Sequence, residues 1–463
     1  MTEMLWQGRF GEPPDDMLLR FSRSIDVDIR LLGYDLAVTH AHCHALVDAG
    51  LLTGEDLDRV EEACDFLLEQ WHAGAIDIEP ADEDVHSLVE RLLTKSLGEL
   101  GRRIHAGRSR NDLVATDFRL WCKDAATSLA AELHLLIDEL GAIAESNTET
   151  VMPGVTHLQH AQPVTLGFHL AAHCFALARD VQRLKWAAKQ ADVSPLGAGA
   201  LAGSTLGLNP QIAADHLGFG AIFDNAMDAV SDRDFACDLC YAVAICAIHL
   251  SRIAEELVLW TTPEFGYARI GESWTTGSSM MPQKQNPDVA ELTRARSGAA
   301  IGDLMTLMAV LKGLPLSYNR DLQEDKAPTF AAADRLGACI EAMRHALRSV
   351  SFDRDRLEEA AAVGDTWATD LAEKLVRQGT PFREAHAAVG RLVALLEEAG
   401  TGIQDAPDEV FARAHPSLRP EDRAVGNPRR IVEGRDGWGS TSPARVKEQL
   451  DLLRGSPESD RRG

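Results

Sequence analysis

Apolar residues recur at three- and four-residue spacing along five stretches of the chain, each long enough for a helix of several turns. This spacing places apolar side chains on one face of an α-helix and so predicts helical structure. The predicted helices cover residues 111–147, 165–190, 227–260, 287–312 and 321–350. The last of them is expected to bend near Pro328, because proline interrupts the interior of a helix.

Residues 236–259 are apolar on nearly every face, with Cys237, Leu239, Cys240 and Val243 close together. A helix that is apolar all round is normally buried. The length and composition of this segment therefore predict the core of an oligomer. Strand signals are few, and aromatic residues make up only 6% of the chain. The predicted fold class is all-α, with a central bundle of long helices.

Shorter helices and more turns flank this bundle on both sides. The sequence therefore predicts three domains: an N-terminal helical domain over residues 1–109, a central long-helix bundle over 110–361 and a C-terminal helical domain over 362–463. The polar residues 456–463 are expected to fray.

The chain is strongly acidic, which limits the partners that it can bind. Its 463 residues include 46 Lys and Arg against 71 Asp and Glu, a net charge of −25 at pH 7. This balance argues against nucleic acid and anionic membranes as partners. No run of about 18 uncharged apolar residues predicts a membrane span. An anionic small molecule remains compatible, because a site can collect Arg and Lys locally.

The expected location of the protein is the cytoplasm. The first residues carry no basic stretch followed by an apolar run, so no signal peptide is expected. The eight cysteines show no regular framework, and the CxxC formed by Cys237 and Cys240 has no second pair at zinc-site spacing. The cysteines are therefore expected to be buried helical thiols in a reducing compartment.

Histidine clusters are the other candidates for metal binding. His169 and His173 stand four residues apart, but no glutamate lies between them, so the HExxH pattern of zinc enzymes is absent. His40, His42 and His44 alternate along a predicted helix and point in different directions. No metal site is predicted.

The segment that most suggests chemistry covers residues 276–287 (TGSSMMPQKQNP). Its glycine, serines and prolines favour a shaped loop between two predicted helices. The loop ends where a helix begins, and the first amides and the dipole of a helix favour an anion. Lys284 adds a positive charge and Asn286 adds donors. Such a loop could bind a carboxylate or act on a proton beside one, but a solvated connection between helices has the same composition.

This loop resembles the GSSxMPxKxN signature of the fumarase/aspartase superfamily, and its fuller form resembles the argininosuccinate lyase and delta-crystallin branch. Other segments resemble the same branch in the same order: residues 6–10 (WQGRF), 82–86 (DEDVH), 105–112 (HAGRSRND), 153–159 (PGVTHLQ), 194–197 (SPLG), 311–315 (LKGLP) and 319–326 (NRDLQEDK). The resemblance extends over nearly the whole chain. It departs at Gln285 and His160, where lysine and arginine are common, which puts the local electrostatics in question and not the reaction.

The resemblance implies a lyase that splits argininosuccinate into arginine and fumarate, the last step of arginine biosynthesis. Such an enzyme removes a proton beside one carboxylate and expels a nitrogen group from the next carbon, through an aci-carboxylate intermediate. By resemblance, Ser278 is the base, and Lys284, Asn286 and loop amides stabilise the developing charge. His157, held charged by Glu291, protonates the leaving nitrogen. Whether Ser278 or His157 takes the first proton is left open.

The resemblance also implies a set of substrate contacts. Argininosuccinate carries three carboxylates and one guanidinium, so most of these contacts are hydrogen-bond donors. They match Ser24, Asp84, Arg110, Asn111, Thr156, Asn286, Tyr318, Gln323 and Lys326. Asp84 is expected to face the guanidinium. Asn111, Thr156, Ser278 and Lys326 are expected at the ends of different helices. The family builds each composite active site from three subunits of a homotetramer and needs no metal or organic cofactor.

Three other interpretations stay open. Another lyase of the superfamily, such as adenylosuccinate lyase, aspartase or fumarase, would share the loop, although segments 105–112 and 319–326 favour the argininosuccinate lyase branch. A crystallin-like structural protein of the same branch would share the fold. A catalytically silent oligomeric scaffold is the third.

Overall fold

The structure is a computed structural model of the chain, and it describes residues 15–454. The segment at residues 6–10 and the polar end at 456–463, which was expected to fray, both lie outside the described residues.

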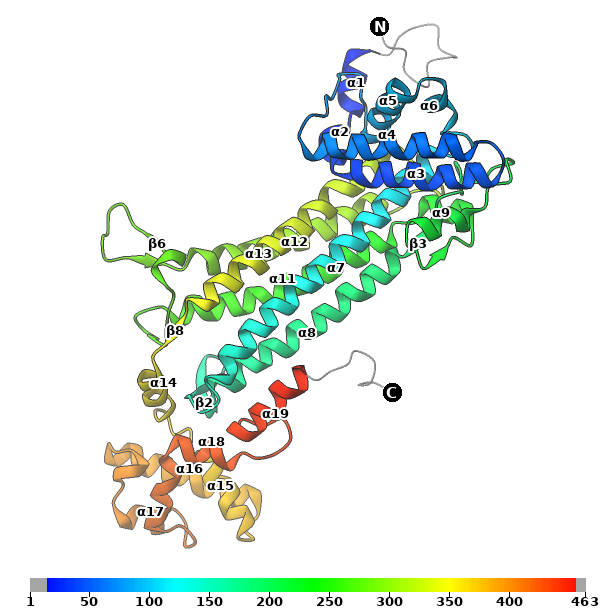
Figure 1. Cartoon of the computed structure of the whole chain (residues 1–463). Coiled ribbons are helices and arrows are strands. Elements are labelled where there is room, and N and C mark those ends of the chain that lie inside the picture. Colours follow the sequence, from blue (N-terminus) through cyan, green and yellow to red (C-terminus); the bar gives the residue numbers. More distant parts are fainter. Residues whose placement is uncertain (1–14, 455–463) are drawn as a thin grey trace. The chain divides into compact units, whose positions relative to one another are not determined.

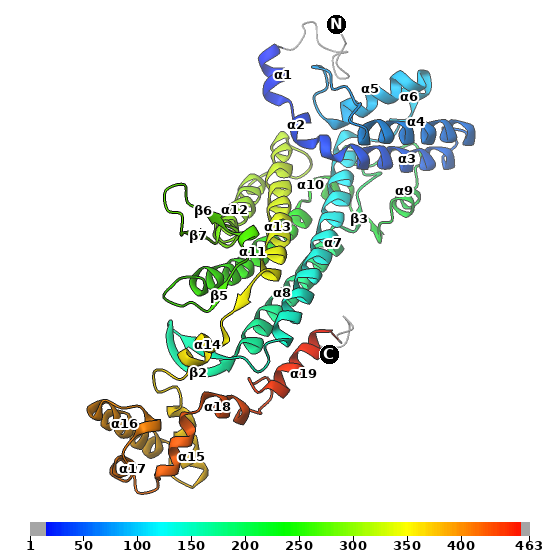
Figure 2. The ribbon, with the colours of Figure 1, turned by 60° about the vertical axis from the view of Figure 1, so that its left-hand side comes forward.

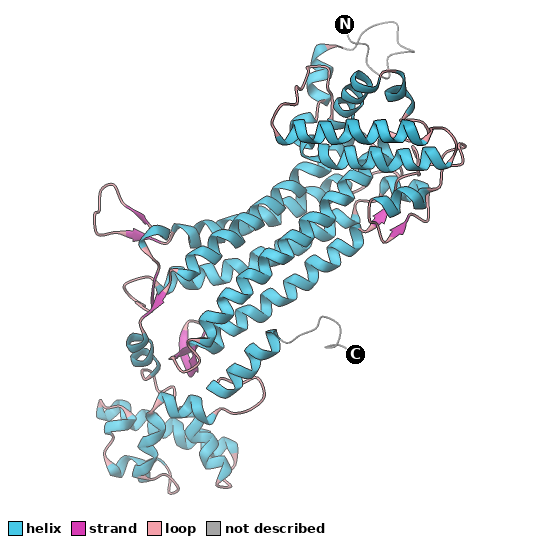
Figure 3. Cartoon of the chain, viewed as in Figure 1, coloured by secondary structure: helices cyan, strands magenta, loops and turns pink. Residues whose placement is uncertain are grey.

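Helices account for most of the described residues, as Figure 3 shows. The strands are short and form four two-stranded pairs. The pairs are β1 (Val151–Thr156) with β2 (Gln159–Thr165), β3 (Val193–Ser194) with β4 (Ala221–Ile222), β5 (Ala268–Arg269) with β8 (Ser351–Phe352), and β6 (Thr276–Gly277) with β7 (Gln285–Asn286). The predicted all-α class is confirmed. Among residues 15–454, no helix combines the length and the apolar character that crossing a bilayer requires.

Five long helices occupy the middle of the chain, and Figure 1 traces them from cyan to yellow. They are α7 (Arg110–Glu145), α8 (Leu166–Ala191), α11 (Asp234–Trp260), α12 (Asp288–Leu311) and α13 (Lys326–Arg348). The helices predicted over residues 111–147, 165–190 and 287–312 are confirmed to within about two residues at each end.

The chain divides into two compact units. Unit 1 contains residues 1–131, 180–247 and 296–338, and unit 2 contains residues 132–179, 248–295 and 339–463. Each of the five long helices contributes residues to both units. The three-domain division at residues 109/110 and 361/362 stays a prediction.

The continuous helix predicted over residues 227–260 is wrong, because the chain breaks between α10 (Ala226–Ser231) and α11. Asp232 takes an extended backbone conformation at the break. The next residue, Arg233, is fully buried and pairs with the buried Asp325 at 2.5 Å. An uninterrupted helix would turn Arg233 in a different direction, so the buried ion pair overrides the local apolar pattern.

The helix predicted over residues 321–350 begins at Lys326 instead, and the bend expected near Pro328 stays a prediction. A short 3₁₀ helix, η4 (Arg320–Asp325), precedes α13, and Pro328 lies in the first turn of α13. The first amides of a helix have no intrahelical acceptor, so a proline there removes no hydrogen bond.

Unit 1 begins with a group of helices around residues that are candidates for the site. They are α1 (Asp16–Ser22), α2 (Ile25–Asp28), the 3₁₀ helix η2 (Ile29–Leu31), α3 (Leu32–Asp48), α4 (Gly54–His72), α5 (Val85–Leu97) and α6 (Glu99–Arg103), followed later by α9 (Pro210–His216). Helices α3 and α4 lie side by side in Figures 1 and 2. Reciprocal capping boxes start α4 at Thr53 and α5 at Asp84.

Aromatic side chains join the long helices inside unit 1. The ring of Phe118 on α7 lies 5.4 Å from that of Phe235 on α11 and 6.1 Å from that of Phe330 on α13, in edge-to-face arrangements. All three side chains are buried. Burying a side chain of this size stabilises the fold by about 1.5–3 kcal/mol, so these contacts fix the three helices against one another within the unit.

Unit 2 ends in a group of shorter helices that enclose their own core. They are α14 (Arg354–Ala361), α15 (Ala368–Arg377), α16 (Phe382–Ala399), α17 (Asp408–Ala414), α18 (Pro428–Gly434) and α19 (Pro443–Arg454), with 3₁₀ turns η5 (Ile403–Asp405) and η6 (Pro420–Gly426). A further 3₁₀ turn of unit 2, η3 (Glu272–Trp274), lies earlier in the chain, just before β6. Leu371, Leu392 and Phe411 belong to one buried apolar cluster between α15, α16 and α17, which Figure 2 shows together. Helices α14 and α18 pack against the β1–β2 hairpin.

The expectation of all-round burial for residues 236–259 is not met within one chain. Leu239, Cys240 and Val243 are buried, but Tyr241 is 49% exposed and Ile248 is 36% exposed. All eight cysteines lie on helices without forming a disulfide, and seven of them are buried. The prediction of buried helical thiols is therefore confirmed for those seven, and Cys237 is half-buried.

Candidate active site

The predicted loop at residues 276–287 is a β-hairpin in unit 2, with β6 and β7 as its short arms. The Oγ of Ser278 accepts hydrogen bonds from the backbone N–H groups of Met280 and Met281, at 3.3 and 3.1 Å. Donors directed at this oxygen favour its deprotonated form over its protonated form. The loop therefore provides the serine with the kind of support that a base requires.

Asn286 and the start of α12 close the base of this hairpin. The Nδ2 of Asn286 donates to the Oγ1 of Thr276 at 3.3 Å, and the Thr276 hydroxyl donates to Asp288, the first residue of α12, at 2.5 Å. Lys284 and Glu291 are exposed, the first on the loop and the second in the first turn of α12. The sequence prediction that the loop opens a helix is confirmed, while its two short strands were not predicted.

His157 lies at the tip of a second hairpin of unit 2, formed by β1 and β2. His157 and Leu158 form a two-residue turn with φ angles of 55° and 58°. Positive φ at both positions is typical of the type I′ turn and costs a residue with a side chain some strain. At Gly154 in β1, an added Cβ would lie 2.6 Å from the Gln162 carbonyl oxygen, so this close pairing requires glycine.

Thr156 is the last residue of β1, so the expectation that it ends a helix is wrong. Thr156 and His157 are both exposed. Among residues 15–454, the structure shows no hydrogen bond or ion pair between His157 and either Ser278 or Glu291. The candidate catalytic groups thus lie on separate exposed segments of unit 2.

The substrate-binding candidates Ser24, Asp84 and Arg110 come together in unit 1. The Ser24 hydroxyl donates to Asp28 at 2.6 Å, and the other oxygen of Asp28 accepts the N–H of Val85 at 3.0 Å, at the start of α5. The Arg110 guanidinium lies 3.3 Å from Asp84. These contacts place one hydroxyl, two carboxyl groups and one guanidinium around the start of α5.

Asp84 is ionised in this arrangement. Burial raises the pKa of its carboxyl group, but His86, Arg110 and hydrogen bonds from Ser87 outweigh burial and lower the pKa below its ordinary value. The neighbouring carboxylate of Glu83 pairs with Arg320 at 2.6 Å, which brings the first residue of η4 to the same place.

Asn111 begins the neighbouring segment of the site. Its Nδ2 donates to the backbone carbonyl of Ala200 at 3.0 Å. The next residue, Asp112, is buried and accepts the N–H groups of Gly197 and Gly199 at 3.1 and 2.9 Å. Gly197 has a φ of 103°, which favours glycine, so the two polar residues at the start of α7 hold a glycine-rich loop against it.

Tyr318, Gln323 and Lys326 follow in chain order around η4. Lys326 is buried and its Nζ lies 2.9 Å from Asp325 and 5.7 Å from the centre of the Phe118 ring. Burial raises the pKa of Tyr318, and the nearby charge of Lys326 acts in the opposite direction. Gln323 is half-buried on η4. Lys326 begins α13, so the expectation that it lies at a helix end is confirmed.

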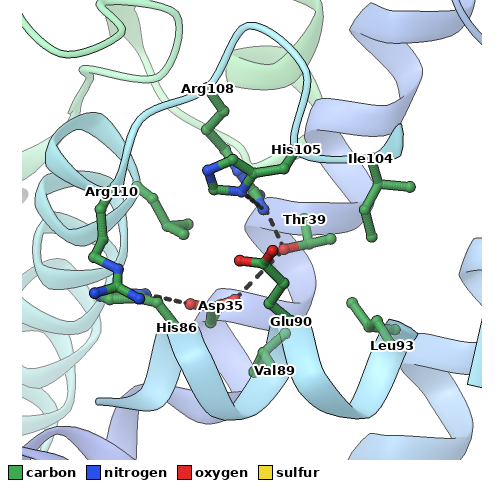
Figure 4. A pocket seen from close by; sticks show the side chains of 11 residues that line it. Asp35, Thr39, His86, Val89, Glu90, Leu93, Ile104, His105, Arg108 and Arg110 are labelled. Atoms are coloured by element: carbon green, nitrogen blue, oxygen red, sulfur yellow. Dashed lines mark hydrogen bonds and ion pairs between the residues drawn. The ribbon is translucent and has the colours of Figure 1, made fainter. Parts of the chain in front are cut away.

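A pocket beside this site is lined by charged side chains that the sequence reasoning did not single out. Figure 4 shows Arg108, Thr39, Asp35 and His86 in one hydrogen-bonded chain. Arg108 donates to the Thr39 hydroxyl at 2.9 Å, that hydroxyl lies 3.4 Å from Asp35, and His86 Nδ1 lies 2.5 Å from the other Asp35 oxygen. Arg110 lines the same pocket. Asp35 and His86 thereby connect α3 to α5, whose N-cap residue is Asp84.

Asp117 completes this buried group from α7. Its carboxylate lies 3.7 Å from the His86 ring, and neither oxygen has a hydrogen-bond partner. Burial, followed by the charge of Asp35, raises the pKa of Asp117 well above its ordinary value. Asp35 on α3 and Asp117 on α7 each stand at a helix position where the hydrophobic spacing predicts an apolar residue. That departure is the sequence signal that could have revealed them.

Two groups among the described residues bring metal-ligating side chains together. One is the buried Asp35, His86 and Asp117, where the histidine already bonds Asp35. The other, in unit 2, consists of His169, His173 and Glu256.

Comparison with known proteins identifies relatives along most of the chain. Residues 8–302 match the protein family described as Lyase, and residues 365–433 match the family described as Argininosuccinate lyase C-terminal. The chain is 48% identical to an argininosuccinate lyase of Saccharopolyspora erythraea, over 97% of this chain and 94% of that protein. It is 47% identical to an argininosuccinate lyase of Frankia casuarinae, over 97% of each chain.

Solved structures share the same fold. The crystal structure of EDDS lyase in complex with formate matches with a TM-score of 0.82 at 26% identity, over 96% of this chain and 90% of that one. A class II fumarase of Schistosoma mansoni matches with a TM-score of 0.74 at 17% identity, over 89% of this chain and 91% of that one. The second likeness concerns the fold alone.

One buried histidine, His42, and one half-buried histidine, His105, predict a loss of stability in acid. Burial, and then Arg108, lower the pKa of His42 to about 3 and that of His105 to about 4. The unfolded chain binds protons at these histidines below pH 6.5 and the folded chain does not. Stability is therefore expected to fall as pH drops from 6.5 toward 4, by up to about 1.4 kcal/mol per pH unit for each histidine.

The measurement is the urea midpoint between pH 7 and pH 5 for the wild type and for His42→Gln. The variant is expected to show a shallower decline, because it lacks one of the two histidines. Asp112 acts in the opposite direction, since burial raises its pKa to about 6, but it is present in both proteins. The exposed His386, changed to Gln, is the control. Equal slopes for the wild type and His42→Gln would contradict the prediction.

Proposed function

The chain belongs to the argininosuccinate lyase family, and on that premise we propose that it splits argininosuccinate into L-arginine and fumarate. The observation that carries the proposal is the identity of 46–48% with proteins of that name over nearly the full length of both chains. The reaction is an elimination: a proton leaves one carbon, the bond from the next carbon to nitrogen breaks, and the nitrogen takes up a proton. It is the last step of arginine biosynthesis.

Ser278 is proposed as the base. The two backbone N–H groups directed at its Oγ support this role, since they favour the ionised oxygen. Lys284 and Asn286 lie on the same hairpin and would stabilise the aci-carboxylate intermediate, whose charge grows during proton removal. In the alternative assignment, His157 takes the first proton, and the same two residues exchange their roles.

His157 and Glu291 are proposed to protonate the leaving guanidino nitrogen. His157 is exposed at the tip of a hairpin, which leaves its ring accessible to substrate and to a neighbouring subunit. Glu291 is exposed in the first turn of α12.

Substrate binding is proposed for the donors of unit 1, together with Thr156 and Asn286 of unit 2. The residues are Ser24, Arg110, Asn111, Tyr318, Gln323 and Lys326. The positive charge of Arg110 and Lys326 suits the carboxylates of argininosuccinate. The lowered pKa of Asp84 keeps its carboxylate ionised, as pairing with the guanidinium of the substrate requires.

A homotetramer with composite active sites is proposed as the assembly. Ile301, Met305 and Met308 of α12 are 40%, 57% and 51% exposed in the single chain, and their spacing places them on one face of the helix. Tyr241 on α11 is 49% exposed. Large apolar side chains in a row on a helix surface are typical of an interface. Covering them with other copies of the chain would also bring exposed catalytic segments against neighbouring subunits.

The cytoplasm is proposed as the location, because none of the eight cysteines, all within the described residues, forms a disulfide. The acidic net charge still disfavours nucleic acid as a partner. The alternatives are a different lyase of the superfamily, a crystallin-like structural protein and a silent scaffold.

An assay of fumarate release separates these alternatives. Purified protein is expected to release fumarate from argininosuccinate, followed by ultraviolet absorbance, and to turn over adenylosuccinate, aspartate and malate far more slowly. The expected specificity reflects the donors and the carboxylate placed for a guanidinium. Turnover of another substrate in preference to argininosuccinate would identify a different lyase. No turnover of any of them by folded protein would favour a structural role.

The Ser278→Ala variant tests the base. Its kcat is expected to fall by roughly 10²- to 10⁴-fold while substrate still binds, because the hydroxyl acts mainly in the transition state. Ser273→Ala, an exposed serine outside the hairpin, is the matched control. Substrate binding is measured by calorimetry alongside the kinetics. Wild-type kcat in Ser278→Ala would remove Ser278 from the mechanism.

Complementation between inactive variants tests whether sites are shared among subunits. If His157 and Ser278 of one site come from different chains, refolding His157→Asn together with Ser278→Ala should restore activity. With random mixing, about a quarter of the sites would receive both intact residues. If both residues of a site came from one chain, every site would carry one lesion.

The assay is fumarate release from the refolded mixture, with each variant refolded alone as the control. Sedimentation establishes that tetramers have formed, and a mass-tagged variant establishes that they are mixed. Persistent inactivity of verified mixed tetramers would contradict the shared site. A monomer at micromolar concentration would contradict the assembly itself.

A further inference from the structure

A cluster of three metal-ligating side chains lies on the long helices of unit 2 and has no part in the proposed reaction. His169 and His173 are on α8, and Glu256 is on α11. The Nε2 atoms of the two rings lie 2.7 and 2.8 Å from the same oxygen, Oε2 of Glu256. Their four-residue spacing places both rings on one face of α8, and that face meets Glu256.

The chemistry of this cluster matches a borderline divalent ion. Two imidazole nitrogens and one carboxylate oxygen form a common set of three protein ligands for zinc, which leaves a fourth position for water. The ligand atoms all lie within 4.8 Å of one another. An ion could therefore be bound with small side-chain movements and without a shift of either helix.

Access and orientation also fit such a site. The side chains of His169, His173 and Glu256 are 24%, 11% and 30% exposed, so the cluster is partly shielded but open to water and ions. The Trp260 ring lies edge-on to the His169 ring, with 5.2 Å between centroids, and limits its rotation. Rigid, partly dry ligands lose less entropy on binding an ion than free surface side chains do.

Glu256 already joins the two rings through one oxygen. Its Oε2 accepts a hydrogen bond from the Nε2–H group of His169 at 2.7 Å and of His173 at 2.8 Å. The two histidines and the carboxylate therefore form a satisfied hydrogen-bonded group without any ion, and a binding measurement separates this state from the metal-bound one.

We propose that His169, His173 and Glu256 bind one Zn²⁺ or a similar divalent transition ion per chain, with water as the fourth ligand. Each ring would offer its Nε2 lone pair and carry its proton on Nδ1. The ion would tie α8 to α11 within unit 2 and stabilise the fold by mass action. The elimination reaction does not pass through it.

The test uses the full-length protein, stripped of metal by a chelator and titrated with Zn²⁺ in a calorimeter. The wild type is expected to bind one ion per chain. In His169→Gln/His173→Gln, the dissociation constant for Zn²⁺ is expected to rise at least about tenfold. Glutamine keeps a donor for Glu256 and so preserves the hydrogen bonds. Circular dichroism establishes that the variant is folded, and Glu256→Gln provides an independent removal of the third ligand.

The control is His40→Gln/His44→Gln, a second histidine pair four residues apart. Those rings lie 4.8 Å apart on α3, and among residues 15–454 no carboxylate oxygen completes a ligand group with them. This variant is expected to keep the binding, and Zn²⁺ is expected to raise the melting temperature of the wild type and the control only. Cobalt substitution adds a spectroscopic signature of four-coordination. The proposal is overturned if the wild type binds Zn²⁺ no more tightly than His169→Gln/His173→Gln, or if the control loses binding equally.

Discussion

The ion pair between Arg233 and Asp325 fixes the part of unit 1 on which the binding groups depend. Both side chains are fully buried, and the Arg233 Nε lies 2.5 Å from Asp325. A charge left alone in such a place would cost several kcal/mol, so neither residue can move without the other. Arg233 precedes the first residue of α11 and Asp325 ends η4, so the pair sets where α11 and α13 begin. Lys326 shares the Asp325 carboxylate, and its position at the start of α13 follows from the same pair.

Paired charges also reconcile the acidic chain with an anionic substrate. The net charge of −25 is spread over the molecule, whereas unit 1 gathers Arg108, Arg110 and Lys326 around the start of α5 and η4. Neighbouring carboxylates, such as Glu83 and Asp84, hold these cationic side chains in place. They leave some of the N–H groups of these side chains available to a substrate. Arg110 illustrates this balance, because it lies 3.4 Å from Glu83 and 3.3 Å from Asp84 and remains about one-third exposed. A site for carboxylates and one guanidinium requires both signs of charge close together.

The sequence predicts local features of this molecule well and tertiary pairings poorly. Hydrophobic spacing predicts α7, α8 and α12 because each is long and uninterrupted. Hydrophobic spacing misses the break before α11. The break depends on the buried ion pair between Arg233 and Asp325, which lie 92 positions apart in the sequence. The hairpins at residues 151–165 and 276–286 are missed because short strands rich in Gly and Pro lack strand periodicity. The motif resemblance provides candidate site residues, but Asp35 and Asp117 are not among them. The spacing of His169 and His173 does not reveal Glu256, which lies 83 residues beyond His173.

The candidate binding residues of unit 1 and the candidate catalytic residues of unit 2 differ in their exposure to water, and this difference suggests why activity would need an oligomer. The binding candidates Lys326 and Asp84 are buried and fixed by partners on helix ends, whereas Ser278 and His157 lie on hairpin loops at the surface of unit 2. Ser278 is only half-buried, and a serine that water reaches gains little from amide donors, because water competes for the same hydrogen bonds and screens the charge. The same donors become effective once water is excluded. In the proposed tetramer, neighbouring chains would supply that exclusion, so activity would depend on assembly even though each chain carries every residue.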